Sequence, residues 1–197
     1  MRLWTIQPFE VWEQLERSGE LLVDEVRLSD DAYVPPAYRW LAGELGRRVS
    51  GYPGTLPWWA YCQKPDLRLF RHSRPAGQRE LRIELEPAAG SFVTFPIWAW
   101  DTVYCGLYLA VTAGEHARWS AALPDTDPNA HPRDFPDPWK SELRVSWSRL
   151  FDPELPRRPW DPWRIGQSGS CEAVLGVLRL EDVRGATPFV GSGRVGR

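Results

Sequence analysis

Two pairs of polar residues have types and spacing that could do chemistry. Asp66 and Arg68 stand two apart in DLRLF, and on a strand that spacing puts both side chains on one face. His131 and Asp134 could form an acid–base pair within a proline-rich stretch. Each pair also has a simpler interpretation. Asp66 and Arg68 could be a surface ion pair, and His131 and Asp134 could be polar residues of a mobile loop with no chemical role. The first pair is retained as a candidate ligand site.

The cysteines and histidines do not have the spacing of a metal site. They are Cys62, Cys105, Cys171, His72, His116 and His131. An odd number of widely separated cysteines, with no CxxC pair, indicates neither a zinc site nor a disulfide framework. We therefore expect no bound metal, and thiols that are reduced and mostly buried.

Tryptophan is the unusual component, with 12 residues beside 19 prolines. Each indole buries a large area, so most of them are expected to fill the core of a loop-rich fold. Some could instead line a cleft for a planar ligand such as a nucleobase or nicotinamide. Trp4, in the opening WTIQP, and Trp147, on a late amphipathic segment beside Arg149, are the candidates for that role.

The overall composition excludes several classes of protein. The chain of 197 residues has a net charge of -2, which argues against a general electrostatic binder of nucleic acid. No apolar stretch reaches about 18 residues, so no membrane-spanning helix is expected. The first residues lack the apolar core of a secretory signal, and a cytoplasmic location without membrane association is the resulting expectation.

Apolar periodicity and turn residues predict the secondary structure. Helices are expected at 8–18, 36–49, 98–112 and 138–151, the first bounded by Pro8 and Gly19. Strands are expected at 21–26, 56–62, 66–70, 80–86, 91–95 and 172–183. The segments 66–70 and 80–86 predict a hairpin with an arginine-rich loop.

These elements lack a regular alternation of strand and helix, so the predicted class is α+β. We expect one domain over residues 1–184, with a small mixed or antiparallel sheet, about four helices and long proline-rich loops. Residues 185–197, rich in glycine, are expected to form a flexible tail.

Blocks along most of the chain resemble the DUF3841 family, whose activity is uncharacterised. They are RLWTIQPFEVWEQLERSGEL, YRW, PDLR, ELRIELE, the tryptophan-containing helix near residue 100, SWSRLF and EAVLGVLRLEDV. The resemblance implies a Ser-Asp pair and a Trp-His pair near the start of the central helix, and a glutamine opening the last strand. Here the Ser-Asp pair is missing, Asp101 follows Trp100 where histidine is expected, and Glu172 stands near the glutamine position.

The layout of the chain also resembles small ADP-ribosyltransferase-like families. These begin with a polar first strand, an amphipathic helix and a glycine, and close with a glutamate at the start of a late strand. The resemblance implies that Arg2, Thr5 and Gln7 bind NAD as a substrate, and that Glu172 is the catalytic carboxylate that stabilises positive charge on the ribose. The alternative for Thr5 and Gln7 is that they cap the helix that follows.

Two further functions remain open. The opening WTIQPFEVWEQLERSGE is similar to ASCH or PUA-like RNA-binding domains, which implies a module that binds a nucleotide or single-stranded nucleic acid. In that module the aromatic residues would stack on bases, and arginines would contact phosphates; these are Arg68, Arg71, Arg74, Arg79 and Arg82. The other alternative is a structural protein that binds a partner chain through its tryptophan- and proline-rich loops.

Overall fold

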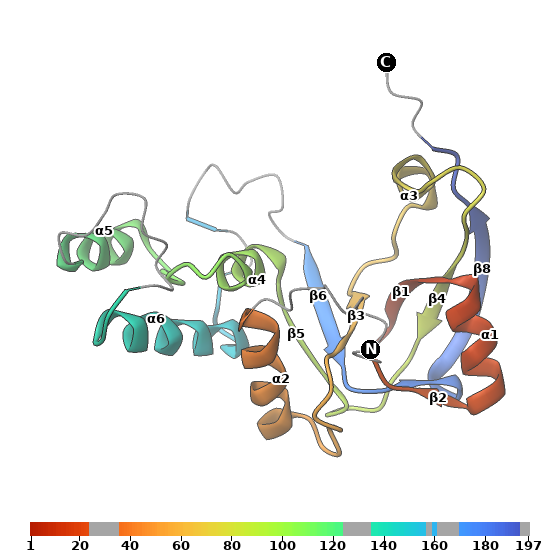
Figure 1. Cartoon of the computed structure of the whole chain (residues 1–197), viewed down its shortest axis with the longest axis horizontal. Helices are drawn as coiled ribbons and strands as arrows, with labels where there is room; N and C mark the ends of the chain where they lie inside the picture. Colours follow the sequence, from red (N-terminus) through yellow and green to blue (C-terminus); the bar gives the residue numbers. More distant parts are fainter. Residues whose placement is uncertain (24–35, 124–134, 157–158, 161–169, 194–197) are drawn as a thin grey trace. The chain divides into compact units, whose positions relative to one another are not determined.

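The computed structural model describes residues 1–23, 36–123, 135–156, 159–160 and 170–193. Within these ranges the protein is α+β, as the sequence predicts (Figure 1). It divides into two compact units, the first made of Met1–Ala32, Ala42–Val93 and Glu172–Arg197, and the second of Tyr33–Leu41 and Thr94–Cys171.

A six-stranded sheet has the order β5-β6-β3-β1-β4-β8, and most of its residues belong to the first unit. Its strands are β1 (Leu3–Pro8), β3 (Trp58–Tyr61), β4 (Arg79–Leu85), β5 (Phe92–Pro96), β6 (Cys171–Leu175) and β8 (Val183–Val190). The pairs β1–β3, β1–β4, β3–β6 and β4–β8 are antiparallel. A two-stranded sheet joins β2 (Glu20–Leu21) to β7 (Leu178–Arg179), which leads into the short 3-10 turn Leu180–Asp182.

Helix α1 (Phe9–Ser18) follows β1 directly. Pro8 precedes its first turn, and Gly19 ends it at a φ of 77°, donating its N–H to the carbonyl of Leu15 at 2.9 Å. Both boundaries agree with the predicted helix at 8–18. Val11 and Leu15 are its buried residues, so the helix covers one face of the sheet with a narrow apolar stripe.

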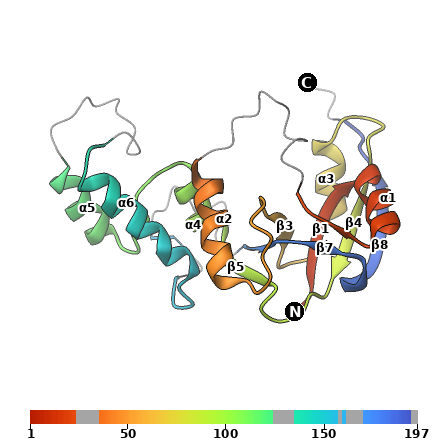
Figure 2. The ribbon, with the colours of Figure 1, turned by 60° about the horizontal axis from the view of Figure 1, so that its bottom comes forward.

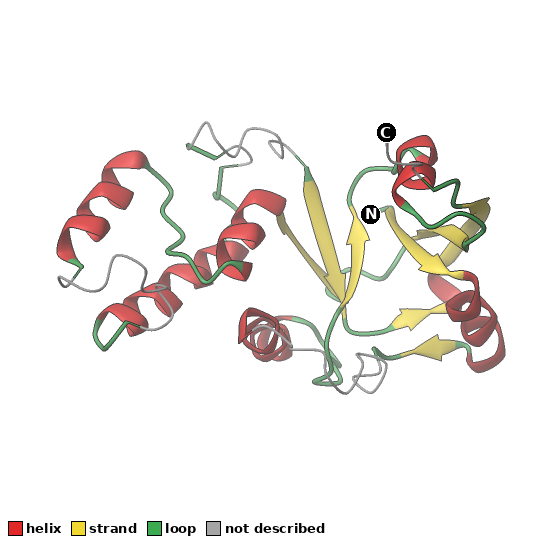
Figure 3. Ribbon diagram, turned by 45° about the horizontal axis from the view of Figure 1, so that its top comes forward, coloured by secondary structure: helices red, strands yellow, loops and turns green. Residues whose placement is uncertain are grey.

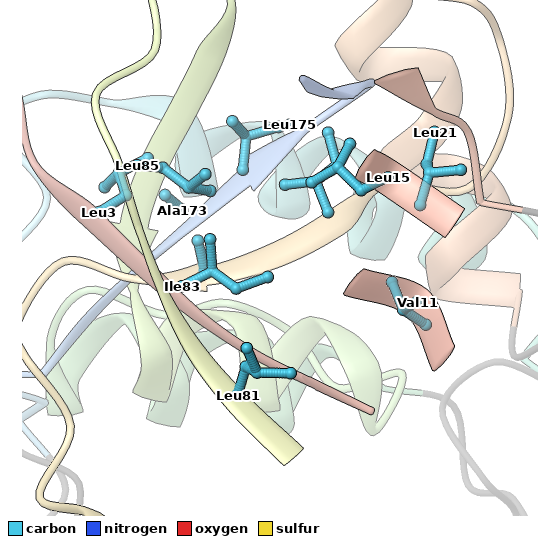
Figure 4. Close-up of a cluster of buried hydrophobic side chains, with 11 residues drawn as sticks. Leu3, Val11, Leu15, Leu21, Leu81, Ile83, Leu85, Ala173 and Leu175 are labelled. Atoms are coloured by element: carbon cyan, nitrogen blue, oxygen red, sulfur yellow. The ribbon is translucent and has the colours of Figure 1, made fainter. Parts of the chain in front are cut away.

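The core of the first unit lies between α1 and that face. Alternate strand residues supply it, because successive side chains of a strand point to opposite faces. Leu81, Ile83 and Leu85 of β4 are all buried, which confirms the alternation expected from ELRIELE. Figure 4 shows them grouped with Leu3, Val11, Leu15, Leu21, Ala173 and Leu175.

The second unit is mainly helical (Figure 2). Its helices are α4 (Ile97–Tyr104), α5 (Ala113–Ala122), α6 (Trp139–Trp147), the 3-10 turn Ser148–Phe151 and the first residues of α2 (Pro36–Arg48). Indole N–H groups tie these helices to nearby backbone. Trp147 donates to the carbonyl of Leu107 at 2.9 Å, and Trp139 donates to that of Ala122 at 2.7 Å. The same elements are drawn in red in Figure 3.

The predicted strand at 66–70 is wrong, because these residues belong to helix α3 (Leu67–Ser73). Asp66 caps this helix by accepting the N–H of Arg68 at 2.9 Å. The predicted hairpin with 80–86 is therefore also wrong, and β4 pairs instead with β1 and β8. The alternating pattern of DLRLF fits a strand, but the capping aspartate outweighs it.

The predicted helix at 98–112 is too long. Helix α4 ends at Tyr104, and Gly106 follows with a φ of 69°, in the region that favours glycine. Thr112 then caps α5 by accepting the N–H of Glu115 at 3.1 Å, and this second helix was not predicted. By contrast, α6 with its 3-10 extension matches the predicted helix at 138–151.

The predicted boundary of the tail also changes. Residues 185–190 lie in β8, which pairs with β4 along Val183–Val190, so the sheet continues past residue 184. The expected strand at 172–183 is broken into β6, β7 and a 3-10 turn. The expected segment 21–26 overlaps β2 only at Leu21, and its last three residues lie outside the described ranges, as do His131 and Asp134.

The three cysteines, all in the described part of the chain, are not joined in disulfides. Cys62 and Cys171 are half-buried, but Cys105 is exposed, so the expectation of buried thiols is wrong for Cys105. No helix in the described ranges has the length and apolarity needed to cross a membrane. Among these same residues, no group of three or more cysteine, histidine or acidic side chains could hold a metal ion.

Candidate functional site

A row of side chains crosses the sheet of the first unit on the face opposite α1. Trp4 of β1 is paired with Tyr61 of β3, and Tyr61 is paired with Glu172 of β6. Directly opposed residues of antiparallel strands carry their side chains on the same face, with Cβ atoms about 4.5–5.5 Å apart. The register therefore places an indole, a phenol and a carboxylate side by side, and all three are half-buried.

Tyr61 is the centre of this row. Burial raises the pKa of its hydroxyl, and the nearby charge of Glu172 raises it further, while Arg74 opposes the shift. Its ring meets Phe70 of α3 edge to face, with centroids 5.7 Å apart. The phenol therefore stays protonated at neutral pH and presents a hydroxyl next to a carboxylate.

Trp4 contributes an unused hydrogen-bond donor. Its Nε1 is buried, and no hydrogen-bond acceptor among the described residues reaches it. An unpaired buried donor costs about 1–3 kcal/mol, so a site that leaves one open can recover that free energy when a ligand or water accepts it. Arg2, two residues before Trp4, pairs with Glu84 at 3.1 Å and brings a cation to the same face.

A buried ion pair lies on the α3 side of the row. Glu80 of β4 is only 3% exposed, and it accepts hydrogen bonds from Arg74 at 2.9 Å and from Gln78 at 3.0 Å. Both oxygens of this carboxylate are thus satisfied, as a buried charge requires. The Arg74 guanidinium lies 5.9 Å from the centroid of the Phe70 ring, so it also fixes the aromatic neighbour of Tyr61.

The structure brings Arg2, Trp4 and Glu172 together on this face, but it separates Thr5 and Gln7 from them. Thr5 is paired with Ile83, a core residue, and so faces α1. The Gln7 amide donates to the Thr5 hydroxyl at 2.7 Å, while no side chain caps the N-terminus of α1. Neither of the two roles expected for Thr5 and Gln7 is thus visible in this arrangement.

The remaining predicted site residues have other partners. Asp66 accepts hydrogen bonds from the guanidinium and from the backbone N–H of Arg68. These bonds lower the pKa of Asp66 to about 2. This pair sits at the exposed start of α3 and fixes the helix terminus. Trp147 belongs to the second unit, where it is 5% exposed and its indole meets that of Trp40 edge to face at 5.4 Å.

A comparison with protein-family models identifies the family of this chain. The model of the family described as Domain of unknown function (DUF3841) matches residues 2–181. The chain belongs to the DUF3841 family. No curated protein matches it, and no solved structure does. The matched range contains Trp4, Tyr61 and Glu172, so the row lies within the DUF3841 domain.

Two residues of this candidate site, Tyr61 and Glu80, were not predicted from the sequence, and Arg74 was predicted only as one of several arginines that could contact phosphates. The alternation in LPWWAYC would have placed Trp59 and Tyr61 on one face of their strand. It could not have shown that this face is shared with Trp4 and Glu172, because that depends on the register between strands distant in sequence. Arg74 and Glu80 fall in the predicted hairpin, whose pairing differs in the structure.

Proposed function

We propose that this DUF3841 protein binds a nucleotide on the face that carries Trp4, Tyr61 and Glu172. The row formed by these three residues is the observation that carries the proposal. Nucleotides combine a flat base, sugar hydroxyls and phosphates, and the face offers a complementary group for each of them.

The base would lie against the aromatic side chains. Stacking of a base on an aromatic residue contributes about 1–3 kcal/mol and tolerates different bases. The indole N–H of Trp4 would donate to a ring nitrogen or carbonyl oxygen and so satisfy a buried donor. Trp4 therefore supplies both affinity and some selection for a base edge that accepts a hydrogen bond.

The sugar and the phosphates would use the charged groups. Glu172 accepts hydrogen bonds, so its carboxylate suits the ribose hydroxyls, which are donors. Arg2 is a cation on this face, and its side chain is 66% exposed, which leaves it room to reach a phosphate. Tyr61 would add a neutral hydroxyl between the base and the carboxylate.

NAD is the first nucleotide to consider, because Glu172 beside its nicotinamide ribose would stabilise the positive charge that grows as the glycosidic bond breaks. In that reaction nicotinamide leaves with the bonding electron pair, and an acceptor forms the new bond to the ribose carbon while losing a proton. The expected contribution of Thr5 and Gln7 is not available on this face. Nucleotide binding is therefore the proposed function. ADP-ribosyl transfer is the reaction that would follow if the bound nucleotide is NAD.

The melting temperature with and without NAD, AMP and ADP-ribose tests the proposal. Ligand at ten times its Kd adds about 1.4 kcal/mol to the free energy of unfolding. For a chain of this length, that raises Tm by about 3–6 °C. Glu172→Gln should reduce the rise, whereas Glu86→Gln, which removes an exposed carboxylate at the end of β4, should not. Absence of any rise at millimolar ligand would reject the proposal.

Single-stranded nucleic acid is a weaker candidate, because most of the arginines expected to bind phosphate have partners within the protein. Arg68 is held by Asp66 and Arg74 by Glu80, while Arg82 donates to the carbonyl of Pro65 at 2.9 Å. The Arg79 guanidinium lies 3.8 Å from the centroid of the Phe9 ring. A short oligonucleotide included in the same melting experiment distinguishes this alternative from binding of a mononucleotide.

A further inference from the structure

A small aromatic pocket lies within the second unit. Its volume is about 90 Å³. Five ring side chains line it, namely Trp98, Tyr108, His116, Trp119 and Trp160, together with smaller apolar residues and Thr102. These residues come from α4, α5, the segment between those helices and the described residues 159–160, so the pocket depends on the fold of this unit.

The walls of the pocket are fixed by hydrogen bonds. The Trp98 indole donates to the carbonyl of Pro156 at 3.0 Å, and the Trp160 indole donates to that of Ala110 at 3.0 Å. Tyr108 stacks on Trp119 with centroids 4.6 Å apart and an angle of 16° between the rings. A pocket whose walls are already held in place loses little conformational freedom when a ligand enters.

Trp119 differs from the other two indoles of the pocket. It is 9% exposed, and its Nε1 is buried with no hydrogen-bond acceptor among the described residues. Backbone carbonyls accept the indole N–H groups of Trp98 and Trp160, whereas no carbonyl of the described residues accepts that of Trp119. Buried donors in native proteins are nearly always paired, so this one calls for an acceptor that the described part of the chain does not supply.

The charges near the pocket are balanced. Glu115 accepts the hydroxyl of Tyr108 at 3.2 Å and the N–H of Val111 at 2.8 Å, and it also forms an ion pair with Arg149. The carboxylate is therefore compensated, and no unpaired charge in this cluster favours an ionic ligand. His116 is exposed, and its ring centroid lies 5.2 Å from that of Trp160, which places an open edge of the pocket at His116.

We propose that this pocket binds the end of a small, planar, uncharged molecule that presents a carbonyl oxygen to the indole N–H of Trp119. The aromatic walls suit a flat apolar group, and the unpaired donor suits an acceptor. An engineered cavity of about 150 Å³ holds a whole benzene molecule. A pocket of about 90 Å³ therefore encloses only the carbonyl and one edge of a ring. The rest of the ligand would extend out of the pocket past His116.

Two matched probes test this site in the full chain. Acetophenone carries a ring and a carbonyl oxygen, whereas α-methylstyrene has nearly the same shape with a CH₂ group in place of that oxygen. In a titration followed by ¹⁵N–¹H NMR, acetophenone should shift the indole signal of Trp119 and bind at least about fivefold more tightly than α-methylstyrene, as expected for one hydrogen bond. The indole signal is assigned by its loss in Trp119→Phe.

The variants give the second comparison. Trp119→Phe keeps an aromatic ring but removes the donor, so it should abolish the preference for acetophenone. Trp12→Phe, a matched substitution on α1 of the first unit, should leave that preference unchanged. Equal affinity of the wild-type protein for the two probes would overturn the proposal, as would the absence of any shift of the Trp119 signal. Both of these outcomes are read in the wild-type chain, whatever the stability of the variant.

Discussion

Tyr61 of β3 lies directly opposite Glu172 of β6, and on its other side it lies directly opposite Trp4 of β1. One phenol is thus flanked by a carboxylate and an indole that come from opposite ends of the sequence. Backbone pairing of three strands fixes this arrangement, so it does not depend on the conformation of a loop. The row is the reason for placing a nucleotide on this face.

The charge of Glu172 should be measurable at Tyr61. Burial raises the pKa of Tyr61 first and Glu172 raises it next, so Glu172→Gln should lower that pKa toward the ordinary value of about 10. The measurement is a spectrophotometric titration of the tyrosines, with Tyr61→Phe identifying the Tyr61 component. An unchanged titration in Glu172→Gln would show that the two side chains do not share a face.

Glycine is required just beyond β8. A Cβ at Gly191 would lie 2.1 Å from the carbonyl oxygen of Pro75 and 2.9 Å from the Cβ of Arg74. Backbone cannot move as readily as a flexible side chain, so Gly191→Ala should lower the free energy of unfolding by about 1–3 kcal/mol. Gly185 lies within β8, and a Cβ there would meet nothing within 4 Å, so Gly185→Ala should change the free energy of unfolding by no more than about 0.5 kcal/mol.

Urea unfolding of the two glycine variants is the measurement, with the wild-type protein as reference. Equal stability of Gly191→Ala and Gly185→Ala would contradict the close approach of the end of β8 to the turn after α3. That approach also supports Arg74, so the less stable variant should lose part of any nucleotide affinity as well.

Tyr52 should make the protein less stable in alkali. Burial raises its pKa to about 12, whereas in the unfolded chain it titrates near 10. Between these values the unfolded state has lost a proton that the folded state keeps, so the free energy of unfolding falls as pH rises. Tyr52→Phe should therefore lose less stability than the wild-type protein between about pH 10 and about pH 12 in urea titrations. Parallel losses in the two proteins would contradict this.

Glu115 should make the protein less stable in acid, whereas Tyr52 does so in alkali. Burial alone would raise its pKa, but the Val111 N–H, the Arg149 guanidinium and the Tyr108 hydroxyl together hold it below its ordinary value. The stabilisation is therefore present above the unfolded pKa, near 4.5, and is lost as pH falls through the lower folded value. Glu115→Gln should cost about 1–3 kcal/mol at neutral pH, and the deficit should shrink in acid. Urea unfolding at both pH values measures it, and a deficit independent of pH would contradict the assignment.

Local signals in the sequence were sufficient for much of the fold. Pro8 and Gly19 bound α1, and the alternation of ELRIELE identifies β4 and its buried face. Where two local signals compete, the prediction failed. The alternation in DLRLF predicts a strand, but Asp66 satisfies the first N–H groups of a helix. Likewise, the apolar run after Trp100 continues past Tyr104, although Gly106 turns the chain there.

The candidate site was only partly predictable, because it depends on pairing between distant strands. Trp4 and Glu172 could be nominated by type and position, but their shared face follows from Tyr61, which joins them. Thr5 was nominated on equal grounds and lies on the other face, one residue away from Trp4. A shift of one residue reverses the face of a strand, so no argument from composition separates these two residues.

Isothermal titration calorimetry with NAD measures directly whether the face that carries Trp4, Tyr61 and Glu172 binds a nucleotide. We expect saturable binding to the wild-type protein at one site. Glu172→Gln should weaken it at least about tenfold because an acceptor of ribose hydroxyls is lost, and Glu86→Gln should leave it unchanged. Trp119→Phe, in the second unit, should also leave NAD binding unchanged. Absence of binding heat with NAD, AMP and ADP-ribose would rule out a nucleotide site on this face, as would equal affinity of the wild-type and Glu172→Gln proteins.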